Sequence, residues 1–462
     1  MPATGQQGME TWRILLFAGG GSELLVLKRP LGLCLPALHI PRYERIAASL
    51  NAEAARVWKL ETVCVAPFII SHPDQTSGDA RYHVMQARRP EELSRIAPQI
   101  MSVASLKADG FSDVRDYLAI RRAMNLDAGG PRRNAEGPFS EFGAFREISA
   151  WVEAQLAPLG RNWNGAFRQW HASESFALLR FQTRDGAVWF KAAGSPNQKE
   201  LPITERLSAL FPRHLPAIIS VRHEWNAWLM NEVTGTSLDS SCDLDAWCCA
   251  ATSFAELQVA SISHASSILA SGAHDSRTAA LVSQVAPFFT EIERLMEQQT
   301  KTTPRKLGPS EIRSLGVRIT EALAQLERAG IPDTLNHFDL NPANVVVRSN
   351  ECKFLDWAEA AVGNPFLSFE YLRQHFLRTF GDEPDTAATF LESYLNVWRH
   401  LLSDSTIALG MEIIPLLAPF AYAVNTLPWK AAHRHAHPES AGLLRSLVRQ
   451  IHCEAEHMTR AV

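Results

Sequence analysis

Short apolar runs alternate with turn residues along the first 125 positions of the chain. Apolar runs at Trp12 to Phe17 and Leu24 to Val26 flank Gly19 to Gly21, and glycines of this kind supply the positive φ angles of a tight turn. This pattern predicts a β-hairpin. Residues 1–125 are expected to form a small α+β domain, whose other elements are a helix over Arg45 to Trp58, a strand over Val63 to Ile70, and helices over Glu91 to Ala97 and Asp113 to Met124.

Residues 126–141 break this periodicity. The segment is dense in glycine, proline and charge and has no apolar face, which is typical of a linker. Beyond it, the Arg184-Asp185-Gly186 turn between two apolar runs favours a second hairpin. The elements expected from here to residue 235 are a helix over Phe142 to Leu156, strands over Phe176 to Phe181, Val188 to Ala192, Ala217 to Val221 and Trp228 to Val233, and a helix over Thr204 to Phe211.

Amphipathic helical segments dominate from residue 236 onward, with one interruption. Gly330 and Pro332 end a helix whose apolar residues share one face: Ile312, Leu315, Ile319, Leu323 and Leu326. The segment Leu335 to Trp357 follows and loses the helical spacing. Pro342 has no amide proton and biases Asn341 toward an extended conformation, so the polar residues around it are expected on a loop.

A second hairpin-like pattern comes directly after this loop. Val345 to Val347 and Lys353 to Leu355 are predicted as strands around the turn Ser349-Asn350-Glu351. A hairpin centred on position 350 places Asn344 opposite Asp356. Cross-strand Cα atoms lie about 4.5–5.5 Å apart, so an amide oxygen and a carboxylate can meet there at one hard cation. Mg²⁺, held by few protein oxygens and completed by phosphate, suits such a site.

Asp339 lies five residues before Asn344, where it is expected to accept or orient a proton. The run from His337 to Asn344, with the spacing His-x-Asp-x-x-x-x-Asn, a hairpin and then an Asp at a strand end, resembles the catalytic segments of the protein-kinase-like fold. In detail, Asp356-Trp357 and Gly363-Asn364-Pro365 are similar to the aminoglycoside phosphotransferase family of small-molecule kinases.

This resemblance implies a bilobal α+β fold, with a β-rich lobe over residues 142–235 and a helical lobe over residues 236–462. It implies transfer of the γ-phosphoryl group from ATP, or GTP, to a hydroxyl of a small molecule. Asp339 would then orient that hydroxyl and take its proton, and Asn344 and Asp356 would hold Mg²⁺.

The same resemblance requires nucleotide-binding residues in the β-rich lobe. Lys191 ends the strand where a lysine can reach the α- and β-phosphates, and either Glu200 or Glu205 can hold its ammonium group. We prefer Glu200 because the residues after it resemble the helix entry in the family. The inter-lobe hinge, whose backbone would meet the adenine, matches the segment that contains Met230 and Glu232.

Three features depart from the family pattern. Phe338 stands where the family usually has glycine, Ser368 falls near a common aspartate, and Trp170 to Phe176 contains no glycine where a loop usually covers the nucleotide phosphates. The last departure supports an alternative, a pseudokinase or nucleotide-binding interaction protein that keeps the fold without the chemistry.

The N-terminal domain resembles a degenerate Nudix-like domain in its Leu35-Pro36 segment and in the helix that precedes Val63-Cys64-Val65. A Nudix hydrolase binds Mg²⁺ through several glutamates on one helix, whereas only Glu53 and Glu61 occur in this stretch. We therefore expect a binding or scaffold domain here. A Nudix-type hydrolase acting through this domain is a second alternative.

The amino-acid composition argues against some classes of binding partner. Among 462 residues, 45 Lys and Arg face 49 Asp and Glu, so there is no overall basic field to hold nucleic acid or an anionic membrane. The longest apolar stretch, Ile413 to Val424, is interrupted by Pro415 and Pro419 and is shorter than the roughly 20 residues of a membrane-spanning helix. The seven cysteines show no Cys-x-x-Cys spacing and no secretory signal is visible, which favours reduced thiols in a cytoplasm.

The sequence says less about the small molecule that would accept the phosphoryl group. Residues 361–462, the expected acceptor-binding part, carry 10 acidic and 8 basic residues, a balance of −2. A polycationic aminoglycoside calls for a more acidic surface, so a sugar, an amino alcohol or another small metabolite fits the composition equally well.

Overall fold

A computed structural model describes residues 8–18, 21–42, 45–70, 80–95, 100–124, 142–425, 429 and 438–460. The chain forms two compact units, the first comprising Met1–Gln198 and Ile218–Glu232 and the second Lys199–Ala217 and Val233–Val462. The prediction of an α+β fold with a β-rich part followed by a helical part is confirmed. The predicted linker at 126–141 and the turn residues Gly19 and Gly20 lie outside the described residues.

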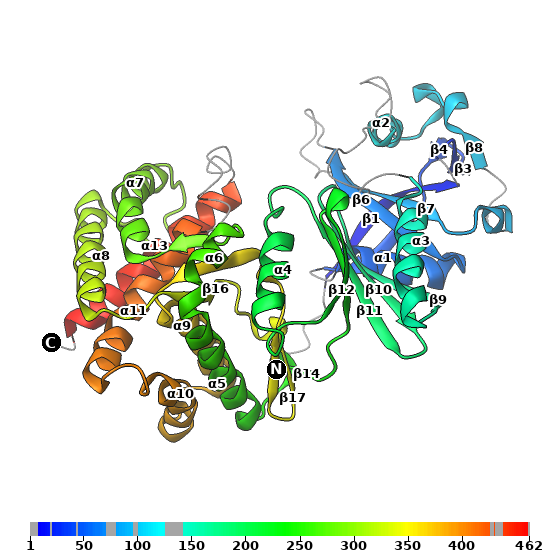
Figure 1. The fold of residues 1–462 in the computed structure, drawn as a ribbon. Coiled ribbons are helices and arrows are strands. Elements are labelled where there is room, and N and C mark those ends of the chain that lie inside the picture. The colour runs from blue at the N-terminus through cyan, green and yellow to red at the C-terminus, as the bar shows by residue number, and fades with distance from the viewer. Residues whose placement is uncertain are drawn as a thin grey trace. The chain divides into compact units, whose positions relative to one another are not determined.

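The first unit begins with a six-stranded sheet in which β1 is central, parallel to β7 and antiparallel to β2 and β5 (Figure 1). The β1–β2 pairing confirms the predicted N-terminal hairpin. The elements of this region are β1 (Met9–Ala18), β2 (Glu23–Leu25), β3 (Leu27–Arg29), β4 (Gly32–Cys34), β5 (Ala37–Pro41), α1 (Ile46–Trp58), β6 (Thr62–Ile70), β7 (Ala80–Ala87), β8 (Ile100–Ser102) and α2 (Val114–Ala123).

One predicted helix of this region is wrong in type. The segment expected as a helix over Glu91 to Ala97 is a 3₁₀ helix, Pro90–Arg95. Of residues 91–93, whose burial is described, Leu93 alone is buried, and short segments with little packing commonly adopt the 3₁₀ form.

The first unit also contains an antiparallel five-stranded sheet in the order β12-β13-β11-β10-β9, covered by helix α3. The β10–β11 hairpin confirms the prediction, and it turns through Arg184 and Asp185 because Thr183 and Gly186 already pair. Strand β9 was not predicted. The bounds are α3 (Ala144–Leu156), β9 (Trp163–Ala172), β10 (Phe176–Thr183), β11 (Gly186–Ala193), β12 (Ile218–Arg222) and β13 (Ala227–Asn231).

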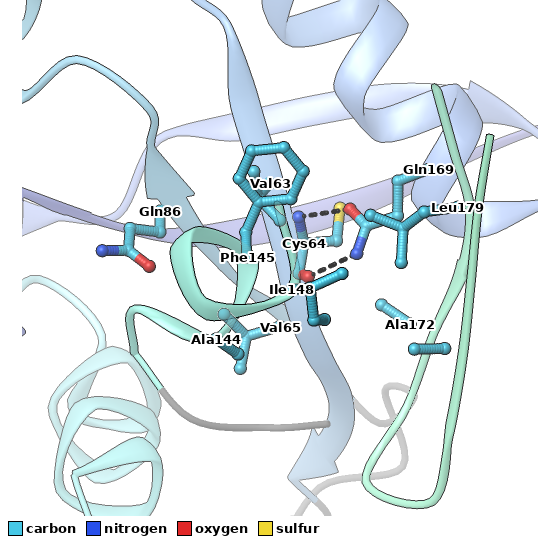
Figure 2. A pocket seen from close by; sticks show the side chains of 11 residues that line it. Val63, Cys64, Val65, Gln86, Ala144, Phe145, Ile148, Gln169, Ala172 and Leu179 are labelled. Atoms are coloured by element: carbon cyan, nitrogen blue, oxygen red, sulfur yellow. Dashed lines mark hydrogen bonds between the residues drawn. The ribbon is translucent and has the colours of Figure 1, made fainter. Parts of the chain in front are cut away.

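Gln169 of β9 joins the two sheets of the first unit. Its side-chain amide accepts from the Cys64 backbone N–H and donates to the Cys64 carbonyl, both at 2.8 Å, and it also accepts from the Asn51 side chain of α1 at 3.0 Å. Figure 2 shows the two bonds between Gln169 and Cys64, beside a cavity of about 20 Å³ that is lined by residues of both sheets and of α3. The N-terminal region therefore packs on the β9–β13 sheet through the buried Gln169 amide, which bonds the N–H and the carbonyl of Cys64 as the backbone of a neighbouring strand would.

The second unit is mainly helical and includes two small sheets, ordered β14-β17-β18 and β15-β19-β16. Its elements are α4 (Glu200–Leu210), β14 (Thr236–Ser237), α5 (Leu244–Ser261), α6 (Ala265–Ala270), β15 (His274–Ser276), α7 (Thr278–Glu297), α8 (Pro309–Ala329), β16 (Thr334–His337), β17 (Val345–Arg348), β18 (Glu351–Phe354), β19 (Ala360–Gly363), α9 (Phe366–Phe380), α10 (Pro384–Trp398), α11 (Asp404–Asn425) and α13 (Pro438–Arg460).

Helix α8 confirms the sequence prediction, since all five residues of its predicted apolar face are buried and Gly330 caps it in the left-handed conformation. Helix α11 differs from expectation, because it continues through Pro415 and Pro419. It is the one helix among the described residues that is long and apolar enough to cross a membrane, and 61% of its most apolar window is buried inside the protein. Such burial is also the pattern of a core helix, where packing offsets the hydrogen bonds that proline removes.

The Gln169 contact can be tested with Gln169→Leu, which keeps the side chain's size but leaves the Cys64 N–H and carbonyl without this partner. We expect the unfolding free energy to fall by about 2 kcal/mol, because unpaired buried polar groups cost about 1–3 kcal/mol each. Thermal unfolding and hydrogen exchange of the β6 amides measure the change. Gln182→Leu on β10 is the control, since Gln182 bonds only within its own sheet among the described contacts. Equal effects of the two substitutions would contradict this role.

Candidate active site

The β17–β18 hairpin forms as predicted but with a register shifted by one position. Val345 pairs with Phe354 and Arg348 with Glu351, so the turn has two residues rather than three. Glu351 belongs to the strand, which moves the centre of the hairpin by half a residue. The Asn344 carbonyl therefore accepts from the N–H of Leu355 at 2.8 Å, and the predicted pairing of Asn344 with Asp356 is wrong.

Asp356 lies one residue beyond this pairing, in the left-handed conformation with φ 63° and ψ 68°. A residue with a side chain rarely adopts this conformation, and such strained positions cluster at functional sites. Because the chain leaves the strand direction at Asp356, strand alternation does not set the direction of its side chain. The carboxylate is exposed, whereas Trp357 after it is buried.

Asn344 and Asp339 are in direct contact. The Asn344 side-chain N–H group donates to the Asp339 carbonyl at 3.0 Å and to its carboxylate at 3.2 Å. Both residues are half-buried, and Pro342–Asn344 forms a 3₁₀ turn in which the Asn341 side chain accepts from the Ala343 N–H. The loop therefore holds the Asp339 carboxylate and the Asn344 amide together, a contact that the sequence analysis did not predict.

Hydrogen bonds to β16, α9 and the end of β18 hold this loop in place. The His337 backbone N–H donates to the Ser368 hydroxyl at 2.8 Å, and the Ser368 N–H donates to the Asn336 side chain at 3.2 Å. The His337 ring donates from Nε2 to the Leu355 carbonyl at 2.8 Å and packs on the Trp357 ring. His337 thus has the structural role that the sequence favoured, tying the strand before Asp339 to the residue before Asp356.

The two departures from the family pattern in this part of the chain have structural roles. Phe338 is buried in the core of the second unit, and its N–H donates to the Glu359 carbonyl at 3.1 Å. Ser368 is fully buried and joins α9 to β16. A serine hydroxyl both accepts and donates, so it serves as the acceptor that the His337 N–H requires at this position.

Two tyrosines near Asp339 were missed by sequence reasoning. Tyr371 on α9 and Tyr422 on α11 stack with ring centroids 6.1 Å apart. Burial, together with the negative charge of Asp339, raises the pKa of Tyr371 to about 12 and raises the pKa of Tyr422 as well. Tyr371 follows Ser368 by three residues and so shares its helix face toward the loop. Only the packing of α9 against α11 brings the pair together.

Lys191 lies on β11, the third strand of the five-stranded sheet, as the resemblance required. It is buried, with its Nζ atom 5.3 Å from the centre of the Phe176 ring and 5.7 Å from that of Trp228. Glu200 and Glu205 both lie on α4, in the second unit. Glu200 is buried and Glu205 is half-buried, and the choice between them as the acidic partner stays a prediction.

Met230 and Glu232 lie at the end of the five-stranded sheet. Met230 pairs with both neighbouring strands, and the Glu232 N–H donates to the Ala187 carbonyl at 3.1 Å. The Glu232 carboxylate accepts from the Arg180 guanidinium at 2.8 Å, which lowers its pKa. Their backbone N–H groups are thus engaged in the sheet, while Glu232 is the last residue before the chain enters the second unit. Adenine recognition by this segment stays a prediction.

The connection between β9 and β10 is a short turn through Ser173 and Ser175 in place of a glycine loop. The Ser173 N–H donates to the Phe176 carbonyl at 2.9 Å, and the Ser175 carbonyl accepts from the Gly194 N–H at 2.6 Å. The Ser173 hydroxyl also accepts from the Ser175 N–H. The turn is closed by serine and backbone hydrogen bonds, so it does not need glycine.

The oxygen atoms of Asn344 and Asp356 are ligands that Mg²⁺ prefers. The side-chain nitrogen of Asn344 donates to Asp339, so the side-chain oxygen of Asn344 points away from Asp339. Among the described residues there is no group of three or more His, Cys, Asp or Glu that could hold a metal ion. Asn344 and Asp356 are thus the oxygen-bearing residues available to a cation that takes few protein ligands, and magnesium binding by them stays a prediction.

Comparisons with known proteins give similarity at the level of structure. No family model and no curated protein matches this sequence. A macrolide 2′-phosphotransferase from Brachybacterium faecium is 18% identical, with 64% of this chain and 98% of that chain covered and a TM-score of 0.43. An ethanolamine kinase from Plasmodium vivax is 10% identical, with 74% and 95% covered and a TM-score of 0.47. Choline kinase LicA from Streptococcus pneumoniae is 14% identical, with 66% and 99% covered and a TM-score of 0.41.

These structures belong to the kind of protein that the sequence motif resembles, small-molecule phosphotransferases and kinases. Their TM-scores lie below 0.5, so the chemistry of this chain has to be inferred from its own residues. The Nudix-like prediction for the N-terminal domain finds no support among the comparisons.

His214 supports the hairpin that precedes Asp356, and its buried ring makes folding stability depend on pH. The His214 carbonyl accepts from the Phe354 N–H at 2.8 Å, and burial lowers the pKa of the ring from 6.5 to about 4. Between these values the unfolded chain binds the proton that the folded chain excludes, so stability falls as the pH drops from about 6.5 toward 4.

His214→Gln should therefore flatten the pH dependence of the unfolding temperature between about pH 7 and about pH 5. His400→Gln, at an exposed position of the same unit, is the control and should leave the slope unchanged. Parallel curves for the protein and His214→Gln would contradict the assignment.

Proposed function

We propose that this chain transfers the γ-phosphoryl group of a nucleoside triphosphate to a hydroxyl group of a small molecule. The observation that carries the proposal is the Asn344 amide bonded to Asp339, on a loop that leads through a hairpin into a strained aspartate. ATP and GTP are both candidate donors.

In this mechanism Asp339 orients the acceptor hydroxyl and accepts its proton. The Asn344 amide donates to the carboxylate and so would fix its orientation toward the acceptor hydroxyl. Tyr371 follows Ser368, whose hydroxyl accepts from the His337 N–H, by three residues on α9 and stacks on Tyr422, so the two rings would form an aromatic wall beside the acceptor.

Asn344 and Asp356 would hold Mg²⁺, which neutralises the charge that develops on the phosphoryl oxygens. Lys191 would steady the α- and β-phosphates, as the resemblance implies. Since the transition state of phosphoryl transfer is loose, positioning and charge neutralisation contribute more than the basicity of Asp339.

A screen of hydroxyl compounds for phosphate acceptance from labelled ATP or GTP tests the proposal. Asp356→Ala should lower transfer by about two to three orders of magnitude, and Asp339→Asn by no more than that, because charge neutralisation dominates the loose transition state. Asp382→Asn, at an exposed carboxylate of the same unit, is the matched control and should keep full activity. Transfer that persists in Asp356→Ala would contradict the mechanism.

The nucleotide contact of Lys191 can be tested separately. Lys191→Met should weaken ATP binding about tenfold or more, because a phosphate-binding charge is lost while the aliphatic stem is kept. Calorimetric titration of the full chain with ATP measures this change. Lys107→Met, at an exposed lysine of the same unit, should bind ATP as the unmodified protein does. Equal affinities for all three proteins would remove Lys191 from the nucleotide site.

A further inference from the structure

A pair of cysteines lies in contact behind the β17–β18 hairpin. Cys249 on α5 and Cys352 on β18 are 103 positions apart in the sequence, yet their sulfur atoms are 3.4 Å apart. Both residues belong to the second unit. The phosphoryl-transfer mechanism uses neither of them.

The two thiols differ in their surroundings. Cys352 is buried, with 2% of its surface exposed, whereas Cys249 is half-buried. The hydrogen bond between them lowers the pKa of Cys249 and raises the pKa of Cys352, which burial raises further. Cys249 is the more exposed thiol of the pair and the one whose pKa is lowered, so a small reagent is expected to react with it first.

The neighbouring Cys248 provides a natural comparison. It lies on the same helix and is also half-buried, but burial raises the pKa of its thiol. The sulfur of Cys249, not that of Cys248, touches a second sulfur among the described contacts. Reactivity is thus expected at one of two adjacent cysteines.

We propose that Cys249 and Cys352 form a peroxide-sensitive dithiol that closes to a reversible disulfide between α5 and β18. The sulfur atoms have to approach from 3.4 Å to about 2.05 Å, the length of a disulfide bond. The oxidant is hydrogen peroxide or a peroxide of the same class.

The reaction balances in two steps. The Cys249 thiolate attacks one peroxide oxygen; the S–O bond forms, the O–O bond breaks, and the leaving hydroxide takes a proton to become water. The Cys352 sulfur then attacks the sulfenic acid; the S–S bond forms, the S–O bond breaks, and the thiol proton leaves with the hydroxide as a second water. Two thiols are oxidised to one disulfide, and one peroxide is reduced to two waters.

The disulfide between Cys249 and Cys352 would restrain β18, the strand that leads to Asp356. Helix α5 already packs on β18 through Phe254 and Phe354, whose ring centroids are 5.4 Å apart. Cys352 lies four residues before Asp356, so a displacement of β18 reaches the aspartate. We expect phosphoryl transfer to fall about tenfold on oxidation, because displacements of the order of 1 Å at a catalytic group cost up to about 10²-fold. This consequence rests on the proposed function, whereas the cross-link does not.

The experiment treats the reduced full-length protein with hydrogen peroxide, alkylates the remaining thiols, and identifies linked peptides by mass spectrometry. We expect the loss of two alkylatable thiols and a peptide that joins Cys249 to Cys352, both reversed by dithiothreitol. Cys248→Ser should form the same link, and Cys249→Ser should not. The unfolding temperatures of the reduced variants show whether each substitution leaves the fold intact.

A link that involves Cys248, a bond between two molecules, or Cys249 sulfinic acid without any link would overturn the proposal. Phosphoryl transfer by the reduced and the oxidised protein is measured separately. If the link forms and transfer is unchanged, the restraint on Asp356 is wrong while the disulfide stands. If the protein shows no transfer in any state, the proposed function fails and the mass-spectrometric result still decides the disulfide.

Discussion

The candidate site depends on Asn344, which holds two parts of the chain together. Its side-chain amide binds the carbonyl and carboxylate of Asp339, and its backbone carbonyl binds the N–H of Leu355. One residue thus links the proposed proton acceptor to the strand end that precedes Asp356. Moving either partner moves the other, which is the coupling that a reaction dependent on relative position requires.

This link is stable because buried hydrogen bonds surround it. His337 reaches the Leu355 carbonyl from below, Ser368 satisfies the His337 N–H, and the His214 carbonyl satisfies Phe354 on the outer edge of β18. Each of these polar groups would cost free energy if it were buried without a partner. Hydrogen bonds to its backbone therefore hold the loop in place.

The N-terminal region belongs physically to the β-rich part of the chain. Gln169 binds the backbone of Cys64 as a neighbouring strand would, and it also accepts from Asn51. A region fastened through such a buried contact is not expected to behave as an independent module. Its sheet therefore contributes to the stability of the β9–β13 sheet, which carries Lys191.

Patterns within short stretches of sequence determined much of this protein: the amphipathic face of α8, the β10–β11 hairpin, and the spacing of Asp339, Asn344 and Asp356. These features depend on local geometry, which residue order controls. The hairpin register was seen only in the structure, because a two-residue and a three-residue turn differ little in sequence, whereas distant contacts hold β18 through the His214 carbonyl and the Pro212 carbonyl. The tertiary structure also decided the Tyr371–Tyr422 and Cys249–Cys352 contacts, since each joins elements far apart in the chain whose approach depends on how the helices pack.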